Sequence, residues 1–150
     1  MHEYRITKYN PKYRNAKGHY LLDEWTCFSD VGDSVTLEEY QKVEQAYIDS
    51  ATEFAKTWSD SSVTITGLEE HDRNTHLKEG QTLKIKELAP VLRSILRNEF
   101  WCRLEAKDGF IHFSWDYYMY VGVSDADENL IKKANQRELF VEPCSSSQKQ

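Results

Sequence analysis

The sequence lacks the long apolar runs and the short motifs that assign many proteins to a membrane or to an enzyme class. No apolar stretch approaches the roughly 18–20 residues that a membrane-spanning helix needs, and the first residues do not resemble a secretory signal. The six glycines are dispersed singly, and no phosphate-binding loop, His-Glu-x-x-His motif or Gly-x-Ser-x-Gly motif is present. We therefore expect a cytoplasmic protein that does not contact a membrane, and the motifs give no argument for catalysis.

Cysteine is scarce as well. The chain has three cysteines, Cys27, Cys102 and Cys144, which is an odd number without Cys-x-x-Cys spacing. This usage is typical of a reducing compartment rather than of a disulfide framework. Cys102 falls on the apolar side of a predicted strand, so we expect it to be a small buried hydrophobe. No cofactor is expected.

The chain does contain enough apolar material for one domain. Of its 150 residues, 39% are hydrophobic and 13% are aromatic, a composition that excludes a disordered tail. A chain of this length buries a core without disulfides or a structural metal. We predict a single globular domain over residues 1–143 and a flexible tail over residues 144–150.

Negative charge is concentrated in one stretch of the chain. The formal charge is −6, but residues 19–80 alone carry four basic against fourteen acidic side chains, whereas residues 1–18 carry five basic against one acidic. An acidic balance argues against direct contact with nucleic acid, which proteins normally bind through a basic surface. Acids on a helix face are explained by solvation alone, whereas those in the loops indicate a basic partner.

Apolar periodicity predicts an α+β fold. Spacing of three and four residues after the capping-box sequence Thr36–Glu39 predicts one long helix as far as Trp58. Two shorter helices are predicted at 85–98, beginning close to Pro90, and at 124–136, with Ser124 as its cap. We expect all three helices to pack on one face of a mostly antiparallel sheet.

Alternation of apolar and polar residues predicts the strands of that sheet. The strands are expected at residues 4–8, 19–22, 25–28, 63–68, 100–105, 110–115, 118–123 and 139–141. The last part of the chain, 100–123, predicts a three-strand antiparallel meander with a hairpin turn at Lys107–Gly109. Residues 69–80 are predicted to form a polar loop.

Histidines occur in two settings that carry chemistry in other proteins. His71 and His76 lie in the predicted polar loop among carboxylates, and such side chains bind divalent metals, but their five-residue spacing fits a solvated loop better, so no metal site is predicted. His112 lies in the meander with Asp116 nearby, and an imidazole beside a carboxylate in a cleft performs acid–base catalysis. A small enzyme that uses His112 with a carboxylate is therefore an alternative function.

Aromatic residues are dense from Trp115 to Tyr120. Alternation along a strand places some of these rings in the core, and rings left exposed are typical of binding hot spots. We predict that Tyr117 and Tyr118 are aromatic anchors for a partner. The same face supports a further alternative, a homo-oligomeric regulatory module.

Four segments of the sequence resemble a family of small bacterial proteins. These segments are Tyr4–Pro11, Leu37–Tyr40, Phe100–Glu105 and Asp116–Gly122, and the resemblance extends over most of residues 4–142. The family comprises immunity proteins of polymorphic toxin and contact-dependent growth inhibition systems. The resemblance implies a cytosolic inhibitor that binds one toxin domain, often a nuclease, and it transfers no catalytic residue.

The leading interpretation is a non-enzymatic immunity protein that neutralises a cognate toxin domain, expected to be a basic nuclease, by occluding its active site. The protein itself is expected to be a monomer or a weak homodimer. The residues predicted to bind the partner are Asp23, Glu24, Asp30, Asp33, Glu69, Glu70, Asp72, Asp116, Tyr117 and Tyr118.

Overall fold

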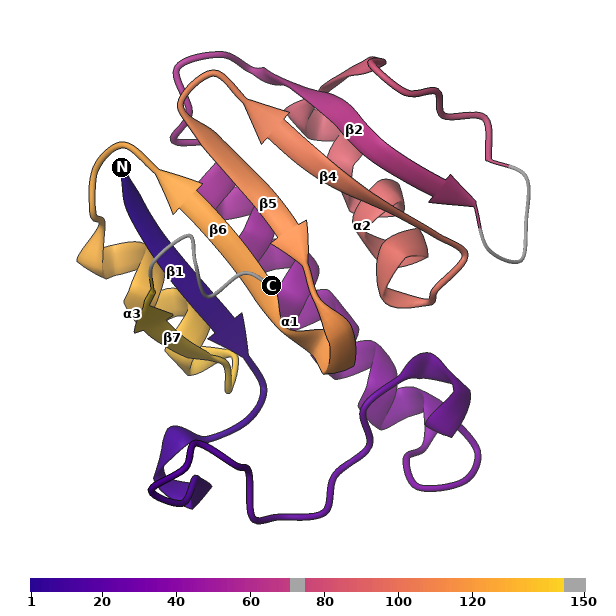
Figure 1. Cartoon of the computed structure of the whole chain (residues 1–150), viewed down its shortest axis with the longest axis vertical. Helices are drawn as coiled ribbons and strands as arrows, with labels where there is room; N and C mark the ends of the chain where they lie inside the picture. The colour runs from indigo at the N-terminus through magenta and orange to yellow at the C-terminus, as the bar shows by residue number, and fades with distance from the viewer. Residues whose placement is uncertain (71–74, 145–150) are drawn as a thin grey trace.

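The chain folds as an α+β protein around one antiparallel sheet. A computed structural model describes residues 1–70 and 75–144, which form a seven-stranded sheet in the order β3-β2-β4-β5-β6-β1-β7 (Figure 1). Each neighbouring pair in that order is antiparallel. The strands are β1 (His2–Thr7), β2 (Ser62–Glu70), β3 (Thr82–Lys84), β4 (Phe100–Ala106), β5 (Gly109–Phe113), β6 (Met119–Val123) and β7 (Phe140–Pro143).

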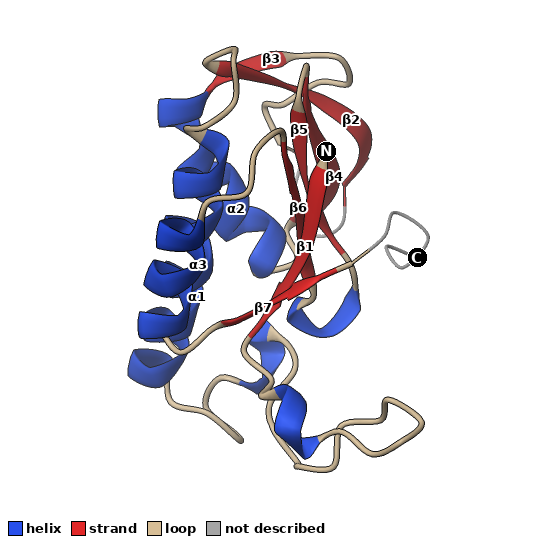
Figure 2. Cartoon of the chain, turned by 90° about the vertical axis from the view of Figure 1, so that its left-hand side faces the viewer, coloured by secondary structure: helices blue, strands red, loops and turns tan. Residues whose placement is uncertain are grey.

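All three helices of the described residues lie on the same face of the sheet, as Figure 2 shows. They are α1 (Leu37–Ala55), α2 (Leu88–Leu96) and α3 (Glu128–Gln136), and short 3-10 turns stand at η1 (Pro11–Tyr13), η2 (Phe28–Asp30), η3 (Ile85–Glu87) and η4 (Trp115–Tyr117). The predicted architecture, one long and two shorter helices on a mostly antiparallel sheet with a β4-β5-β6 meander, is confirmed.

Helix α1 supplies the central layer of the core. Its predicted stripe is buried at Tyr40, Tyr47 and Phe54, each at most 1% exposed, whereas Leu37 at its first turn remains 49% exposed. The Thr36 hydroxyl accepts a hydrogen bond from the Glu39 amide at 3.1 Å, as the capping sequence predicts.

The helix boundaries differ in detail from the prediction. The segment 85–98 begins as η3, and α2 starts at Leu88, which puts Pro90 in the first turn, where its missing N–H costs no intrahelical bond. The cap of α3 is Asp127, which accepts from the Asn129 amide at 2.9 Å. The prediction of Ser124 as that cap is wrong, because its hydroxyl bonds Asp108 instead.

The strand predictions fail at three places. Residues 19–28 do not form strands: Tyr20 makes an isolated bridge with Arg14, and Phe28 begins η2. Strand β2 is longer than expected, so Glu69 and Glu70 belong to it and not to a loop. The three residues of β3 gave no alternation long enough to detect.

The last described residue lies beside β1. Cys144, predicted to open the tail, donates its amide to the Glu3 carbonyl at 3.0 Å, while 145–150 lie outside the described residues. Among the helices that the structure describes, none is both long and apolar enough to cross a membrane.

Candidate protein-binding site

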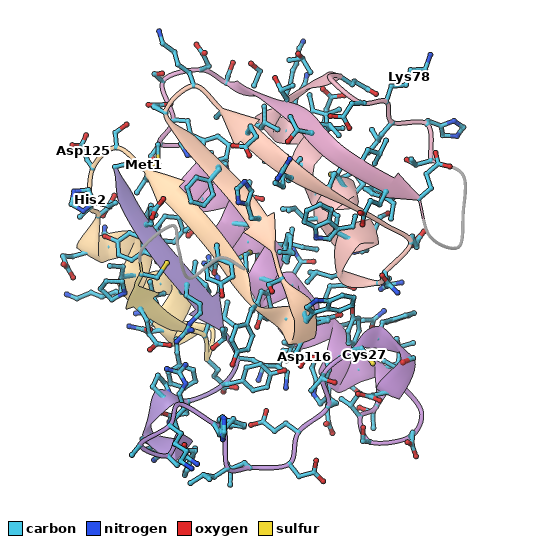
Figure 3. All side chains as sticks on the ribbon, viewed as in Figure 1. Met1, His2, Cys27, Lys78, Asp116 and Asp125 are labelled. Atoms are coloured by element: carbon cyan, nitrogen blue, oxygen red, sulfur yellow. The ribbon has the colours of Figure 1, made fainter. Side chains whose placement is uncertain are left out.

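A hollow of about 430 Å³ lies at one end of the inner strands β4 and β5, where β4 begins and β5 ends. We call it the Trp115 pocket. In Figure 3 its labelled members Asp116 and Cys27 lie next to each other below the sheet. Its lining residues are Thr26, Cys27, Phe28, Glu69, Ile95, Leu96, Asn98, Trp101, Phe113, Ser114, Trp115, Asp116 and Tyr117.

Trp115 is the most exposed large hydrophobic side chain among those of the described residues, at 87%. It stands at the first position of η4, directly beside the pocket. Single exposed hydrophobic side chains are common on protein surfaces, but Trp115 adjoins the apolar lining of the pocket, and a contiguous apolar patch with polar residues at its rim is typical of a binding surface. Tryptophan is also among the residues enriched in hot spots.

The backbone that carries Trp115 is strained. Asp116 has φ 60° and ψ 35°, and Tyr117 has φ 66°. Two consecutive residues other than glycine in the left-handed region cost about 1–3 kcal/mol each, and such strain persists only when the surrounding structure holds it in place.

Three tyrosines hold this turn from beneath. Tyr117 is 6% exposed, and its hydroxyl donates to the Leu96 carbonyl at 2.6 Å and bonds the Tyr40 hydroxyl at 2.7 Å. The Tyr47 hydroxyl donates to the Tyr117 carbonyl, and the Tyr9 hydroxyl donates to the Asp116 carbonyl, each at 2.7 Å. Burial raises the pKa of Tyr117 far above its ordinary range, so its hydroxyl is protonated at neutral pH and donates to the Leu96 carbonyl.

Glu69 reaches the pocket because β2 contains a bulge. Two residues, Gly67 and Leu68, lie between Thr66 and Glu69, whereas only Cys102 lies between their partners Arg103 and Trp101 on β4. Since side chains alternate between faces, this extra residue turns Glu69 to the face that Trp101 occupies, away from the core. Strict alternation from Thr66 predicts the opposite face.

The bulge is held by a carboxylate from the loop that follows. Glu79 accepts from the Leu68 amide at 2.8 Å and from the Gly67 amide at 3.0 Å. These two bonds lower the pKa of Glu79. Gly67 adopts φ +63°, which favours glycine, and a Cβ there would lie 3.3 Å from the Arg103 guanidinium.

The acidic loop 23–34 forms a second hollow, of about 370 Å³, lined by Asp23, Glu24, Trp25, Asp30 and Ser34. Two of its carboxylates already have internal partners. Glu24 pairs with Lys8 at 3.0 Å and with the Tyr20 hydroxyl. Asp30 accepts from the Thr26 amide at 2.9 Å, which lowers the pKa of Asp30.

The predicted partner-binding residues therefore fall into separate groups. Glu69, Asp116 and Tyr117 line the Trp115 pocket, and Asp23, Glu24 and Asp30 line the second hollow. Asp33 and Glu70 are exposed, and Asp72, like His71, lies outside the described residues.

The prediction of Tyr117 as an aromatic anchor needs correction, whereas that of Tyr118 stays a prediction. Tyr117 is a core residue whose hydroxyl is bonded inside the protein, so it cannot serve as an exposed anchor. Tyr118 is half-buried against Tyr9 and Arg5. The exposed ring is that of Trp115, which lay in the same aromatic run but was not among the predicted residues, because alternation does not continue through a turn with positive φ.

His112 lies on the face of the sheet opposite the helices. Its Nε2 is 2.7 Å from Glu105 Oε1, and its ring stacks on Phe110 with centroids 4.5 Å apart. His112 lines neither hollow. Within 1–70 and 75–144, no group of three or more His, Cys, Asp or Glu side chains is placed to hold a metal ion.

Comparison of the chain with protein-family models, with curated proteins and with solved structures found no match.

Proposed function

We propose that this protein is an immunity protein that neutralises a cognate toxin domain by binding it through the surface around Trp115. The observation that carries the proposal is the 87% exposure of Trp115 on a turn that internal hydrogen bonds hold rigid. When a tryptophan anchors an interface, its truncation typically costs about 2 kcal/mol or more of binding free energy. A pre-formed turn avoids the ordering cost that binding otherwise carries.

Charge supports a basic partner. Glu69 and Asp116 flank the pocket, and Asp23 and Asp33 are exposed on the neighbouring loop. The whole chain carries a formal charge of −6. Such a surface attracts a positively charged protein at long range and raises its association rate, with an effect that salt screens.

The two alternative functions have less support. His112 has a carboxylate partner but lines neither hollow, whereas acid–base catalysis needs a site that encloses a substrate. The exposed Trp115 is compatible with self-association, and light scattering coupled to size-exclusion chromatography distinguishes that case. We expect a monomer, or a weak dimer that the partner displaces.

The function is tested with any toxin domain that a gene next to this chain's own gene encodes. Toxin genes and their immunity genes work as pairs, so the domain is expressed with and without this protein and cell survival is counted. We expect survival to be restored and the two proteins to purify as a stable complex. Continued killing at equal or higher levels of this protein, with no complex formed, would contradict the proposal.

A further inference from the structure

The Trp115 pocket has an apolar floor and an acidic mouth. Ile95, Leu96 and Phe113, each 5–7% exposed, form part of the floor. Glu69 and Asp116 are exposed and come from separate elements, β2 and η4. A ligand that fits must therefore present an apolar stem together with a positive group.

Two indole rings add a second requirement. The Trp101 indole is fixed, because its Nε1 donates to the Phe113 carbonyl at 3.0 Å, and Trp115 also lines the pocket. Aromatic faces attract cations, and tryptophan does so most strongly. A flat cation gains stacking as well as charge from such a ring.

The chain makes such a contact itself, next to the pocket. The Arg97 guanidinium lies 4.8 Å from the Phe28 ring centroid while its Nε donates to Glu44 at 2.8 Å. Phe28 is also a lining residue of the Trp115 pocket. Beside the pocket, the protein therefore already holds one arginine between an aromatic ring and a carboxylate.

We infer that the Trp115 pocket binds an arginine side chain of the partner. The methylene stem lies on the apolar floor, as long cationic side chains do on apolar surfaces. The guanidinium stacks on an indole and donates to Glu69 and Asp116. Arginine fits better than lysine because the five donors of the planar guanidinium can reach two carboxylates. The ammonium of lysine is a compact and strongly hydrated charge. Identifying the partner as a toxin rests on the proposed function, but the recognition of arginine does not.

The test uses Nα-acetyl-arginine amide as the probe and the indole N–H signals of Trp101 and Trp115 in nitrogen-15 NMR spectra as the readout. The signals are assigned with the variants Trp101→Phe and Trp115→Phe. We expect saturable shifts of both signals with a Kd on the order of millimolar. The matching lysine amide binds at least threefold more weakly, and the norleucine amide, which has the stem without the charge, produces no saturable shift.

Charge variants separate the site from general attraction. The double variant Glu69→Gln, Asp116→Asn weakens the binding of the arginine probe at least fivefold. The control Asp60→Asn, Asp125→Asn removes the same charge from exposed positions outside the pocket and changes the Kd less than twofold. In Figure 3 Asp125 lies beside Met1, away from Asp116.

Three results would overturn the inference: no shift of either indole signal, equal binding of the norleucine amide, or equal weakening by the two double variants. Because the titration contains no toxin, it does not depend on the proposed function. Toxin neutralisation without any effect of the probe overturns the arginine site alone, and binding of the probe without neutralisation leaves the site standing while the proposed function fails.

Discussion

Replacing Tyr117 by phenylalanine removes a single oxygen atom at the base of the η4 turn. That hydroxyl donates to the Leu96 carbonyl at 2.6 Å and bonds the Tyr40 hydroxyl at 2.7 Å. Both partners are buried, with Tyr40 at 0% and Leu96 at 5% exposure, so water cannot replace the lost bonds without a change in the structure. The substitution therefore tests whether the turn is held from inside the protein.

The expected cost follows from those two partners. A buried polar group that loses its hydrogen bond costs about 1–3 kcal/mol. Taking the lower part of this range, because a small movement of Tyr40 regains some bonding, we expect a loss of about 2–4 kcal/mol in the free energy of unfolding. For a chain of 150 residues, this corresponds to a decrease in Tm of roughly 5–15 °C.

The adjacent tyrosine is the control. Tyr118 is half-buried, and its ring contacts Tyr9 and Arg5, which phenylalanine preserves. We expect Tyr118→Phe to change stability by at most about 0.5 kcal/mol. Urea unfolding at pH 7 measures both variants, and equal stability of the Tyr117 and Tyr118 variants would refute the reasoning.

Two further predictions concern charge. The double reversal Glu69→Lys, Glu70→Lys should reduce the association rate with the toxin domain on the order of tenfold at low salt and flatten the salt dependence of that rate. Stopped-flow fluorescence measures both quantities. If neither the rate nor its salt dependence changes, the end of β2 is not part of the interface. Glu142 accepts two bonds from Arg14, at 2.6 and 2.7 Å, which lower the pKa of Glu142 below its ordinary value of 4.5. The stability that this pair contributes is fully present above pH 4.5 and is lost as the pH falls through the lowered pKa. Glu142→Gln should therefore cost about 1.5–3 kcal/mol at pH 7 and progressively less as the pH falls below 4.5. A cost that stays constant down to the pH at which the protein unfolds in acid would exclude the ion pair as its cause.

The sequence alone predicts the elements whose side-chain period is regular. The stripe on α1 and the alternation through β4, β5 and β6 repeat over enough residues to determine both the element and its buried face. The same reasoning fails for residues 19–28, where aromatic side chains pack on α1 without pairing as strands: the Trp25 and Phe28 rings lie 5.4 and 5.0 Å from that of Tyr40.

The candidate site lies where the period is broken. The bulge before Glu69 and the positive φ angles at Asp116 and Tyr117 each change the face on which the following side chains lie. Neither break is marked by a proline, and only Gly67 hints at the first. For this reason the sequence does not predict that Trp115 is exposed and Tyr117 buried.

The central claim is that Trp115 is the anchor of the partner interface, and calorimetric titration of the toxin domain with Trp115→Ala tests it most directly. The control is Leu21→Ala, which truncates another exposed apolar side chain, 63% exposed and outside the pocket. We predict that Trp115→Ala weakens binding about 30-fold or more, which corresponds to at least about 2 kcal/mol, whereas Leu21→Ala changes the Kd less than threefold. Unchanged affinity of the Trp115→Ala variant would contradict the account.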